Sequence, residues 1–119
     1  MNRLKLAAIA ALAAFVLPAA SGLAASPKLI GTVGPGFTIT LTQGGKKVKT
    51  LKAGKYTFVV TDKSANHSFG IDGPNGWSKD VTTVPFTGTK TFTVNLKKGK
   101  YKYYCTPHES TMFGNFTVT

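Results

Sequence analysis

A short segment near the end of this 119-residue chain restricts its possible folds more than any other stretch. It begins with Tyr-Lys-Tyr-Tyr-Cys, an alternation that predicts a β-strand whose core face carries Tyr101, Tyr103 and Cys105. Cys105 is the only cysteine, and the stretch from Cys105 through His108 to Met112 is eight residues long. Any fold of the chain must therefore accommodate a thiol, an imidazole and a thioether together at one end of a strand.

These three side chains match the ligands of one class of metal site. Thiolate and thioether sulfur are soft ligands, and together with imidazole they select copper. The only other histidine, His67, lies in the sequence Asn-His-Ser-Phe and is the one candidate for a second imidazole. Two histidines and a cysteine in a plane, with a weak axial methionine, are the ligands of an electron-transfer copper site. We therefore predict that His67, Cys105, His108 and Met112 bind one copper ion, which cycles between Cu(I) and Cu(II).

Two motifs resemble those of a known family. The run Tyr104–His108, followed by Met112 and Gly114, resembles the copper loop of cupredoxins, especially those of the plastocyanin and amicyanin types. The sequence around His67 is similar to that family's separate first histidine. The resemblance covers residues 29–119, and the spacing between His108 and Met112 is intermediate between the two loop types.

The resemblance also implies surroundings for the ligands. His108 would be the solvent-facing ligand, in an apolar rim formed by Gly34, Pro35, Pro107 and Pro74. Ser68 and Thr106 directly follow two of the predicted ligands. By the resemblance they would hydrogen-bond each other and lock the two ligand segments together, whereas two solvated hydroxyls are the alternative. Glu109 is expected to be exposed, since a carboxylate would oppose Cu(I).

The N-terminus has the layout of a secretory signal peptide. A short basic region, residues 1–5, precedes an apolar run, residues 6–17, and Pro18 and small residues as far as Ala25 follow it. The apolar run is shorter than the roughly 20 residues that span a bilayer, so a retained anchor is the less favoured alternative. We predict a Sec-type signal over residues 1–25, export to the periplasm or the extracellular space, and no membrane span in the mature chain.

The single cysteine agrees with the metal prediction. An exported chain that used cysteine structurally would carry a pair, and a leftover thiol is either intermolecular or reactive. Ligation by copper would protect such a thiol in an oxidising compartment. The alternative, an inert buried cysteine, does not explain the histidine three residues later.

The chain is strongly basic, with 15 Lys and Arg, four Asp and Glu, and a formal net charge of +11. Without Arg3 and Lys5 of the predicted signal, thirteen basic and four acidic residues remain, a formal charge of +9. A field of one sign accelerates the encounter with an oppositely charged partner. We expect an acidic redox protein or an acidic surface, met where Lys100 and Lys102 adjoin Tyr104. The alternative is that the lysines only keep strand edges soluble. No nucleic-acid recognition motif is present, so nucleic acid is not an expected partner.

Beyond the signal, the sequence is typical of β-strands. Threonine, valine, phenylalanine and tyrosine dominate, and glycine, proline and asparagine interrupt them every ten residues or so. Seven or eight such strands in one domain, residues 26–119, predict an all-β fold, and the cupredoxin resemblance makes it a monomeric Greek-key β-sandwich. The expected strands are 29–33, 37–42, 48–51, 56–61, 81–86, 91–96, 100–105 and 115–119, with a short extended segment at 67–71 and a hairpin joining 81–86 to 91–96.

One pattern occurs twice. Leu-Lys-x-Gly-Lys-Tyr is found at residues 51–56 and again at 96–101, each time at the start of an alternating strand. The glycine suits a tight turn, and the tyrosine begins an inward face. Similar hairpin chemistry explains the repeat as well as duplication does, so it carries no functional prediction.

Three classes of function remain open. An electron carrier is favoured, because four ligands would leave no vacancy for a substrate. An enzyme is not expected, since two histidines cannot build the further copper sites of an oxidase or nitrite reductase. A copper store or chaperone is the alternative. A polysaccharide-binding sandwich would need an exposed aromatic platform, for which Trp77 is the one tryptophan.

Overall fold

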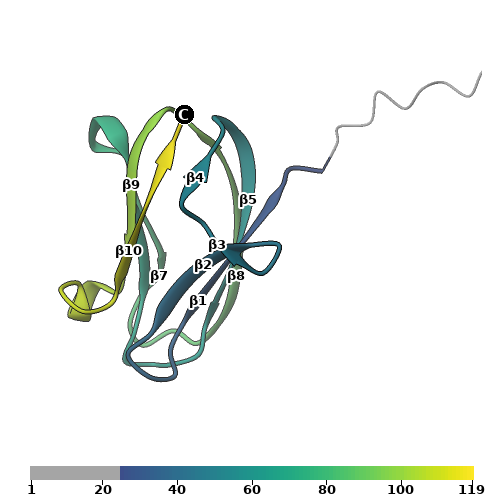
Figure 1. Ribbon diagram of the computed structural model, residues 1–119. Helices are drawn as coiled ribbons and strands as arrows, with labels where there is room; N and C mark the ends of the chain where they lie inside the picture. The colour runs from purple at the N-terminus through teal and green to yellow at the C-terminus, as the bar shows by residue number, and fades with distance from the viewer. Residues whose placement is uncertain (1–24) are drawn as a thin grey trace, which may run out of the picture.

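Two five-stranded sheets pack face to face in the computed structural model, which describes residues 25–119 (Figure 1). The strand orders are β3-β2-β1-β5-β8 and β4-β10-β9-β6-β7. The predicted all-β sandwich is confirmed, whereas the predicted signal over residues 1–25 lies, except for Ala25, outside the described residues. No helix among residues 25–119 is long and apolar enough to cross a membrane.

The elements are β1 (Lys28–Val33), β2 (Ile39–Gln43), β3 (Lys46–Lys47), β4 (Thr50–Leu51), β5 (Gly54–Asp62), β6 (Phe69–Asp72), η1 (Pro74–Gly76), β7 (Ser78–Thr82), β8 (Gly88–Leu96), β9 (Gly99–Tyr104), η2 (Thr106–His108) and β10 (Phe113–Val118).

The core between the sheets follows from the alternation of the strands. In β5 every second side chain from Tyr56 to Asp62 is buried, and in β9 Tyr101 and Tyr103 face inward, as the sequence predicts. Cys105 continues this inward face just beyond the last residue of β9 and is fully buried. The predicted side of the cysteine is therefore confirmed.

The register brings three connections to one end of the sandwich. Val33 at the end of β1 pairs with Asp62 at the end of β5, because these two strands run parallel. Tyr104 at the end of β9 pairs with both Gly70 of β6 and Phe113 of β10. The connections β1–β2, β5–β6 and β9–β10 consequently meet at the same end, which Figure 1 shows at the bottom.

The predicted hairpin between residues 81–86 and 91–96 is wrong. Strand β7 lies at Ser78–Thr82 and pairs with β6, whereas β8 pairs with β5 in the other sheet. The stretch after β7 leaves its sheet in a turn, in which the Phe86 N–H donates to the Thr83 carbonyl at 2.8 Å. Pro85 has no N–H for a sheet ladder, so the β-branched residues before it could not extend the strand through this position.

Candidate metal centre

His67, Cys105 and His108 meet at the end of the sandwich where the three connections converge. One ligand atom from each lies within 4.8 Å of the others. The Cys105 Sγ is 3.7 Å from Nδ1 of His67 and 3.6 Å from Nδ1 of His108, and the two nitrogens are 3.2 Å apart. His67 and the loop that carries Cys105 and His108, two separate parts of the sequence, therefore form a compact triangle of one sulfur and two nitrogens.

The size of this triangle fits a metal ion. The circle through its three corners has a radius of about 2.0 Å, as the three distances require. Zinc, a comparable borderline metal, makes bonds of about 2.0–2.1 Å to imidazole and about 2.3 Å to thiolate. An ion near the centre of the triangle would thus contact all three atoms without a large rearrangement. The mixed sulfur and imidazole donor set also suits copper.

Cys105 is held by two hydrogen bonds, one to its sulfur and one from its backbone N–H. Its side chain is fully buried, and the Ser68 N–H donates to the sulfur at 3.4 Å. The Cys105 N–H donates to the Met112 carbonyl at 3.0 Å and so closes the loop between β9 and β10. The amide aimed at the sulfur and the closed loop together fix where the side chain of Cys105 lies.

His67 lies in the turn between β5 and β6 rather than in the extended segment that the sequence predicts. It is 3% exposed, and its N–H donates to the Ser64 carbonyl at 3.2 Å. The turn is anchored by Asp62, a buried carboxylate that accepts from the Ser64 N–H at 3.1 Å and from the Thr82 hydroxyl at 2.7 Å. The same Thr82 oxygen accepts the Phe69 N–H at 2.9 Å, so β5, β6 and β7 are all joined beside the histidine.

His108 is placed by the short turn η2. Its N–H donates to the Cys105 carbonyl at 3.0 Å, and its own carbonyl accepts the Met112 N–H at 2.8 Å. The ring is half-buried, whereas Pro107 and Glu109 on either side are exposed, as predicted for Glu109. The turn therefore fixes the direction of the imidazole while leaving part of it at the surface.

A hydrogen bond joins the two segments that carry Cys105 and His67. The Thr106 N–H donates to the Ser68 hydroxyl oxygen at 2.9 Å, and Ser68 is only 2% exposed. The predicted link therefore exists, but Thr106 contributes its backbone amide rather than its hydroxyl. The side chain of Thr106 is exposed.

Met112 is 1% exposed and packs in the core cluster that also contains Cys105. Its carbonyl accepts a hydrogen bond from the Cys105 N–H, and its N–H donates one to the His108 carbonyl. These two bonds place the residue directly beside the triangle. The side chain's role as a copper ligand stays a prediction.

Phe37 is a neighbour of the site that the sequence does not reveal. Its ring centroid lies 5.3 Å from that of His67 and 5.1 Å from that of His108, edge to face in both cases. The side chain is nevertheless 69% exposed. The alternation from Phe37 to Leu41 suggests that all these residues belong to a strand, but β2 begins only at Ile39. No sequence signal places the ring over the two histidines.

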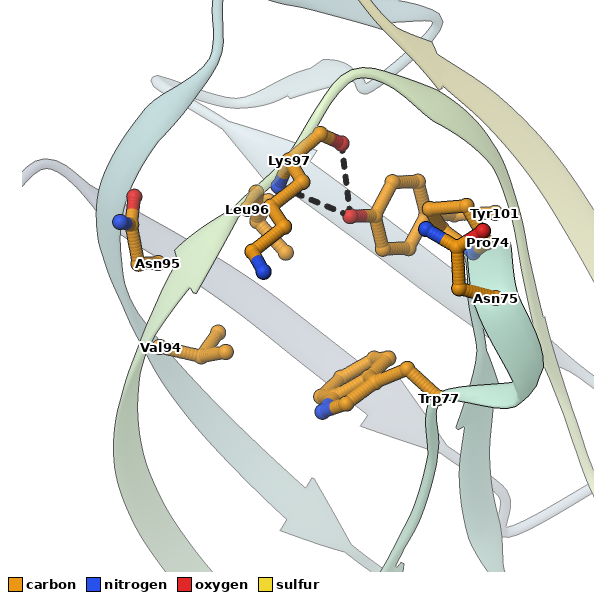
Figure 2. Close-up of a pocket in the computed structure, with 8 residues that line it drawn as sticks. All are labelled: Pro74, Asn75, Trp77, Val94, Asn95, Leu96, Lys97 and Tyr101. Atoms are coloured by element: carbon orange, nitrogen blue, oxygen red, sulfur yellow. Dashed lines mark hydrogen bonds between the residues drawn. The ribbon is translucent and has the colours of Figure 1, made fainter.

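The expected rim is corrected in part. Gly34 does adjoin the site, because a Cβ there would lie 3.3 Å from Cδ2 of His67. Pro74 does not, since it lies against Gly99 at the start of β9, and Gly99 is at the opposite end of the strand from Tyr104. Figure 2 shows Pro74 with Trp77 and Tyr101 around a pocket of about 210 Å³ at that far end.

Trp77 lines this distant pocket rather than forming an open platform. Its ring is half-buried and packs edge to face with Tyr101, at 6.1 Å between centroids. Val94 and Leu96 line the pocket with it (Figure 2). A flat, exposed aromatic surface, which the polysaccharide-binding alternative requires, is therefore not what this tryptophan provides.

Tyr104, which precedes the cysteine, is buried and hydrogen-bonded. Its hydroxyl donates to Asp72 Oδ1 at 2.9 Å, and burial, followed by this carboxylate, raises the pKa of the phenol to about 12. Of the two lysines expected beside it, only Lys102 is near, with Nζ 5.9 Å from the ring centre and 3.1 Å from Glu109. Lys100 lies near the opposite end of β9, next to Gly99.

Comparison with known proteins agrees with this geometry. A sequence profile for copper binding proteins of the plastocyanin/azurin family matches residues 38–119. The chain belongs to this family. Copper is therefore the metal that the triangle of His67, Cys105 and His108 fits, with one ion per chain.

The structure is similar to solved structures of rusticyanin. One structure of this copper protein, at 2.1 Å resolution, has 20% sequence identity to the present chain and a TM-score of 0.57. The alignment covers 77% of this chain and 76% of that chain. Reduced rusticyanin is 22% identical with a TM-score of 0.54, over 77% and 78% of the two chains. Rusticyanin from Thiobacillus ferrooxidans is 28% identical with a TM-score of 0.47, over 77% and 76%. The first two likenesses support the cupredoxin fold. No protein with a curated description matches this sequence.

Proposed function

We propose that this protein is an electron carrier in which His67, Cys105, His108 and Met112 hold one copper ion. The observation that carries the proposal is the triangle of one sulfur and two nitrogens, whose size fits a single ion and whose donor set suits copper. Bound copper supplies a one-electron couple between Cu(I) and Cu(II). Met112 supports the proposal because it is buried next to Cys105, where a thioether would complete the ligand set.

The residues around the triangle would keep it rigid during electron transfer. Cu(I) and Cu(II) prefer different geometries, so a scaffold that fixes one compromise lowers the cost of changing oxidation state. The Thr106–Ser68 hydrogen bond holds two ligand segments together, and the turn η2 fixes His108. A store or chaperone needs a site that opens for exchange. These bonds therefore favour the carrier, although fast copper release would favour the store.

The surface at this end suits brief contact with a redox partner. Three of the four large hydrophobic residues exposed among residues 25–119 lie at this end: Phe37 at 69%, Val84 at 49% and Phe113 at 46%. Val84 belongs to the β7–β8 connection, which also reaches this end, because Gly88 at the start of β8 pairs with Asp62 at the end of β5. Phe37 covers both imidazoles, so a partner docked here would come close to the ligands. We propose that the donor or acceptor is a redox protein that docks on this apolar end and whose acidic groups are attracted by the basic domain.

The decisive experiment is a copper titration with a visible spectrum and voltammetry. We expect one ion per chain, an intense visible band and a reversible one-electron wave. Cys105→Ser should abolish the band and weaken copper binding strongly. Ser110→Ala, in the same loop, should change neither. A Cys105→Ser variant that stays coloured would exclude the site, and an irreversible wave with rapid copper release would favour the store.

We further propose export through the Sec-type signal at residues 1–25. The apolar run and the small residues after Pro18 support this interpretation. Mass spectrometry of the protein recovered outside the cytoplasm should give a chain that begins at Ala25 or Ser26. A full-length mass would instead indicate a retained N-terminal segment.

A further inference from the structure

The repeated Leu-Lys-x-Gly-Lys-Tyr pattern builds two matching turns. The first turn leads into β5, where the Tyr56 hydroxyl donates to the Lys52 carbonyl at 2.7 Å. The second leads into β9, where the Tyr101 hydroxyl donates to the Lys97 carbonyl at 2.8 Å. Figure 2 shows this second bond, together with the one that Tyr101 accepts from the Lys97 N–H at 3.0 Å. In each turn a tyrosine thus ties down the backbone of the lysine four residues before it.

The glycines of the two turns also correspond. Gly54 has a φ of +149° and Gly99 has a φ of +150°, a conformation that residues with a Cβ rarely adopt. The tyrosine that follows each of them is buried, Tyr56 at 8% exposure and Tyr101 at 4%. The same six residues therefore fold in the same way twice, and both turns are fixed rather than loose.

The two turns lie next to each other, at the end of the sandwich opposite the metal centre. Gly54 at the start of β5 pairs with Leu96 at the end of β8, directly before the second turn. β9 then runs from the second turn to Tyr104, beside the metal-binding loop. In Figure 1 the turns are at the top of the sandwich, and the metal-binding loop is near the bottom.

The side chains of the turns form a concentrated positive charge, which we term the basic pole. All its lysines are exposed, and none makes an ion pair with a carboxylate among residues 25–119, where Lys102–Glu109 is the one salt bridge. Thr119, the last residue of the sequence, accepts the Ala53 N–H here, and a carboxylate at that position would offset one charge. The lysines of the pole are Lys52, Lys55, Lys97, Lys98 and Lys100.

The chemistry of the pole favours a lipid surface over a protein partner. Protein interfaces depend on a few buried aromatic and apolar contacts. The large hydrophobic residues exposed in the described part of the chain, however, are Ile30, Phe37, Val84 and Phe113, and none belongs to the two turns. Clusters of four to eight basic residues close to a membrane bind anionic phospholipid headgroups, and each Lys or Arg near the surface contributes about 1 kcal/mol. Lysine suits this mode because its compact, hydrated charge needs no matching pocket.

The path of the chain agrees with this partner. Lys28, the first residue of β1, pairs with Thr57 near the start of β5, and the Pro27 carbonyl accepts the Thr57 N–H at 2.9 Å. The sequence before Ala25 is therefore connected to the half of the sandwich that carries the basic pole. An apolar segment that engaged a membrane before cleavage would therefore be attached to the chain at this half.

We propose that the basic pole binds anionic phospholipid membranes and thereby turns the metal centre away from the bilayer. The binding needs no copper, since no lysine of the pole lies at the metal end. In this orientation the apolar surface around Phe37 stays accessible to a redox partner in solution. The protein would then be concentrated at a membrane while its apolar end remains free to bind a redox partner.

Vesicle sedimentation tests the proposal. The protein, as recovered from an expressing cell and without copper, is mixed with phosphatidylcholine vesicles that contain either no phosphatidylglycerol or about one-third phosphatidylglycerol. The neutral vesicles measure any binding that does not depend on the charge of the lipid. We expect clear additional binding to the anionic vesicles, and this binding should weaken as salt rises, because salt screens the charges.

Two matched variants locate the surface. Lys52→Gln combined with Lys97→Gln neutralises equivalent positions of the two turns. Each lysine near a membrane contributes about fivefold to binding, so the pair should reduce the partition coefficient about 25-fold. Lys63→Gln combined with Lys90→Gln removes the same amount of charge from exposed lysines nearer the metal end. This variant should change the partition coefficient little. Equal losses in both variants, or no preference of the wild type for anionic vesicles, would overturn the proposal.

Discussion

Ser68→Ala removes the hydrogen bond that joins the two ligand segments and leaves the rest of the site intact. The Ser68 oxygen accepts the Thr106 N–H at 2.9 Å, and the Ser68 N–H that points to the Cys105 sulfur belongs to the backbone and is retained. Alanine fills nearly the same space, so the change creates almost no cavity. The expected effect is therefore that of one lost hydrogen bond at a buried position.

The magnitude follows from the surroundings of the two groups. A typical hydrogen bond contributes about 1 kcal/mol to stability, and a buried donor left without a partner costs about 1–3 kcal/mol. The Thr106 side chain is exposed, so water can reach part of this region, and we expect a loss of about 1–2 kcal/mol. For a domain of this size the loss corresponds to a decrease in melting temperature of roughly 5–15 °C.

Urea unfolding of the copper-free protein measures this loss. Trp77 is the only tryptophan and is half-buried, so its fluorescence reports the unfolding of the domain. Ser110→Ala is the matched control, because Ser110 is exposed in the metal-binding loop. Ser68→Ala should also weaken copper binding, since the ligand segments are no longer joined before the metal arrives. A free energy of unfolding within 0.5 kcal/mol of the wild type, about the usual effect of a surface substitution, would show that the bond does not stabilise the site.

Three further changes test other parts of the site. Met112→Gln should keep copper bound but lower the reduction potential in voltammetry, since an oxygen donor favours Cu(II); an unchanged potential and spectrum would show that Met112 only fills the core. Phe37→Ala should alter the unfolding free energy by less than about 1 kcal/mol, because the ring is 69% exposed, yet it should speed copper loss to a chelator by uncovering the imidazoles. The pKa of Tyr104, raised to about 12 from the usual value of 10, predicts stability that is complete below pH 10 and lost as pH rises toward 12. Tyr104→Phe should remove that part of the alkaline decrease, and an unchanged pH profile would contradict the assignment.

Local patterns were sufficient to predict most of the strands, although not the one expected at residues 81–86, and to single out three of the four proposed ligands. The alternation in β5 and β9 reflects burial on one face only, so the inward side of Cys105 could be read from the sequence. Cys105, His108 and Met112 lie in one loop, and their spacing carries the signal. His67 could be named only because the chain has no third histidine.

Contacts between distant segments could not be predicted in this way. Phe37 lies in the connection between β1 and β2, and its ring reaches the two histidines only because this connection packs beside the other connections at that end. The alternation of the sequence around Phe37 fits a strand equally well. Residues 81–86 contain β-branched side chains that resemble a strand, but the choice of sheet depends on partners far along the chain. The sequence points to the hydroxyl of Thr106, whereas the fold uses its amide, a group that every residue except proline carries.

The uneven distribution of the proposed ligands has a consequence for how the metal is acquired. Cys105, His108 and Met112 remain close together even in the unfolded chain, since eight residues span them, whereas His67 joins them only when β6 and β9 pair. The unfolded protein would therefore retain considerable affinity for Cu(I), and copper would stabilise the native state by less than its native affinity implies. The same property permits loading during biogenesis: the loop could capture an ion from a donor before the sheets assemble, and folding would then complete the coordination with His67.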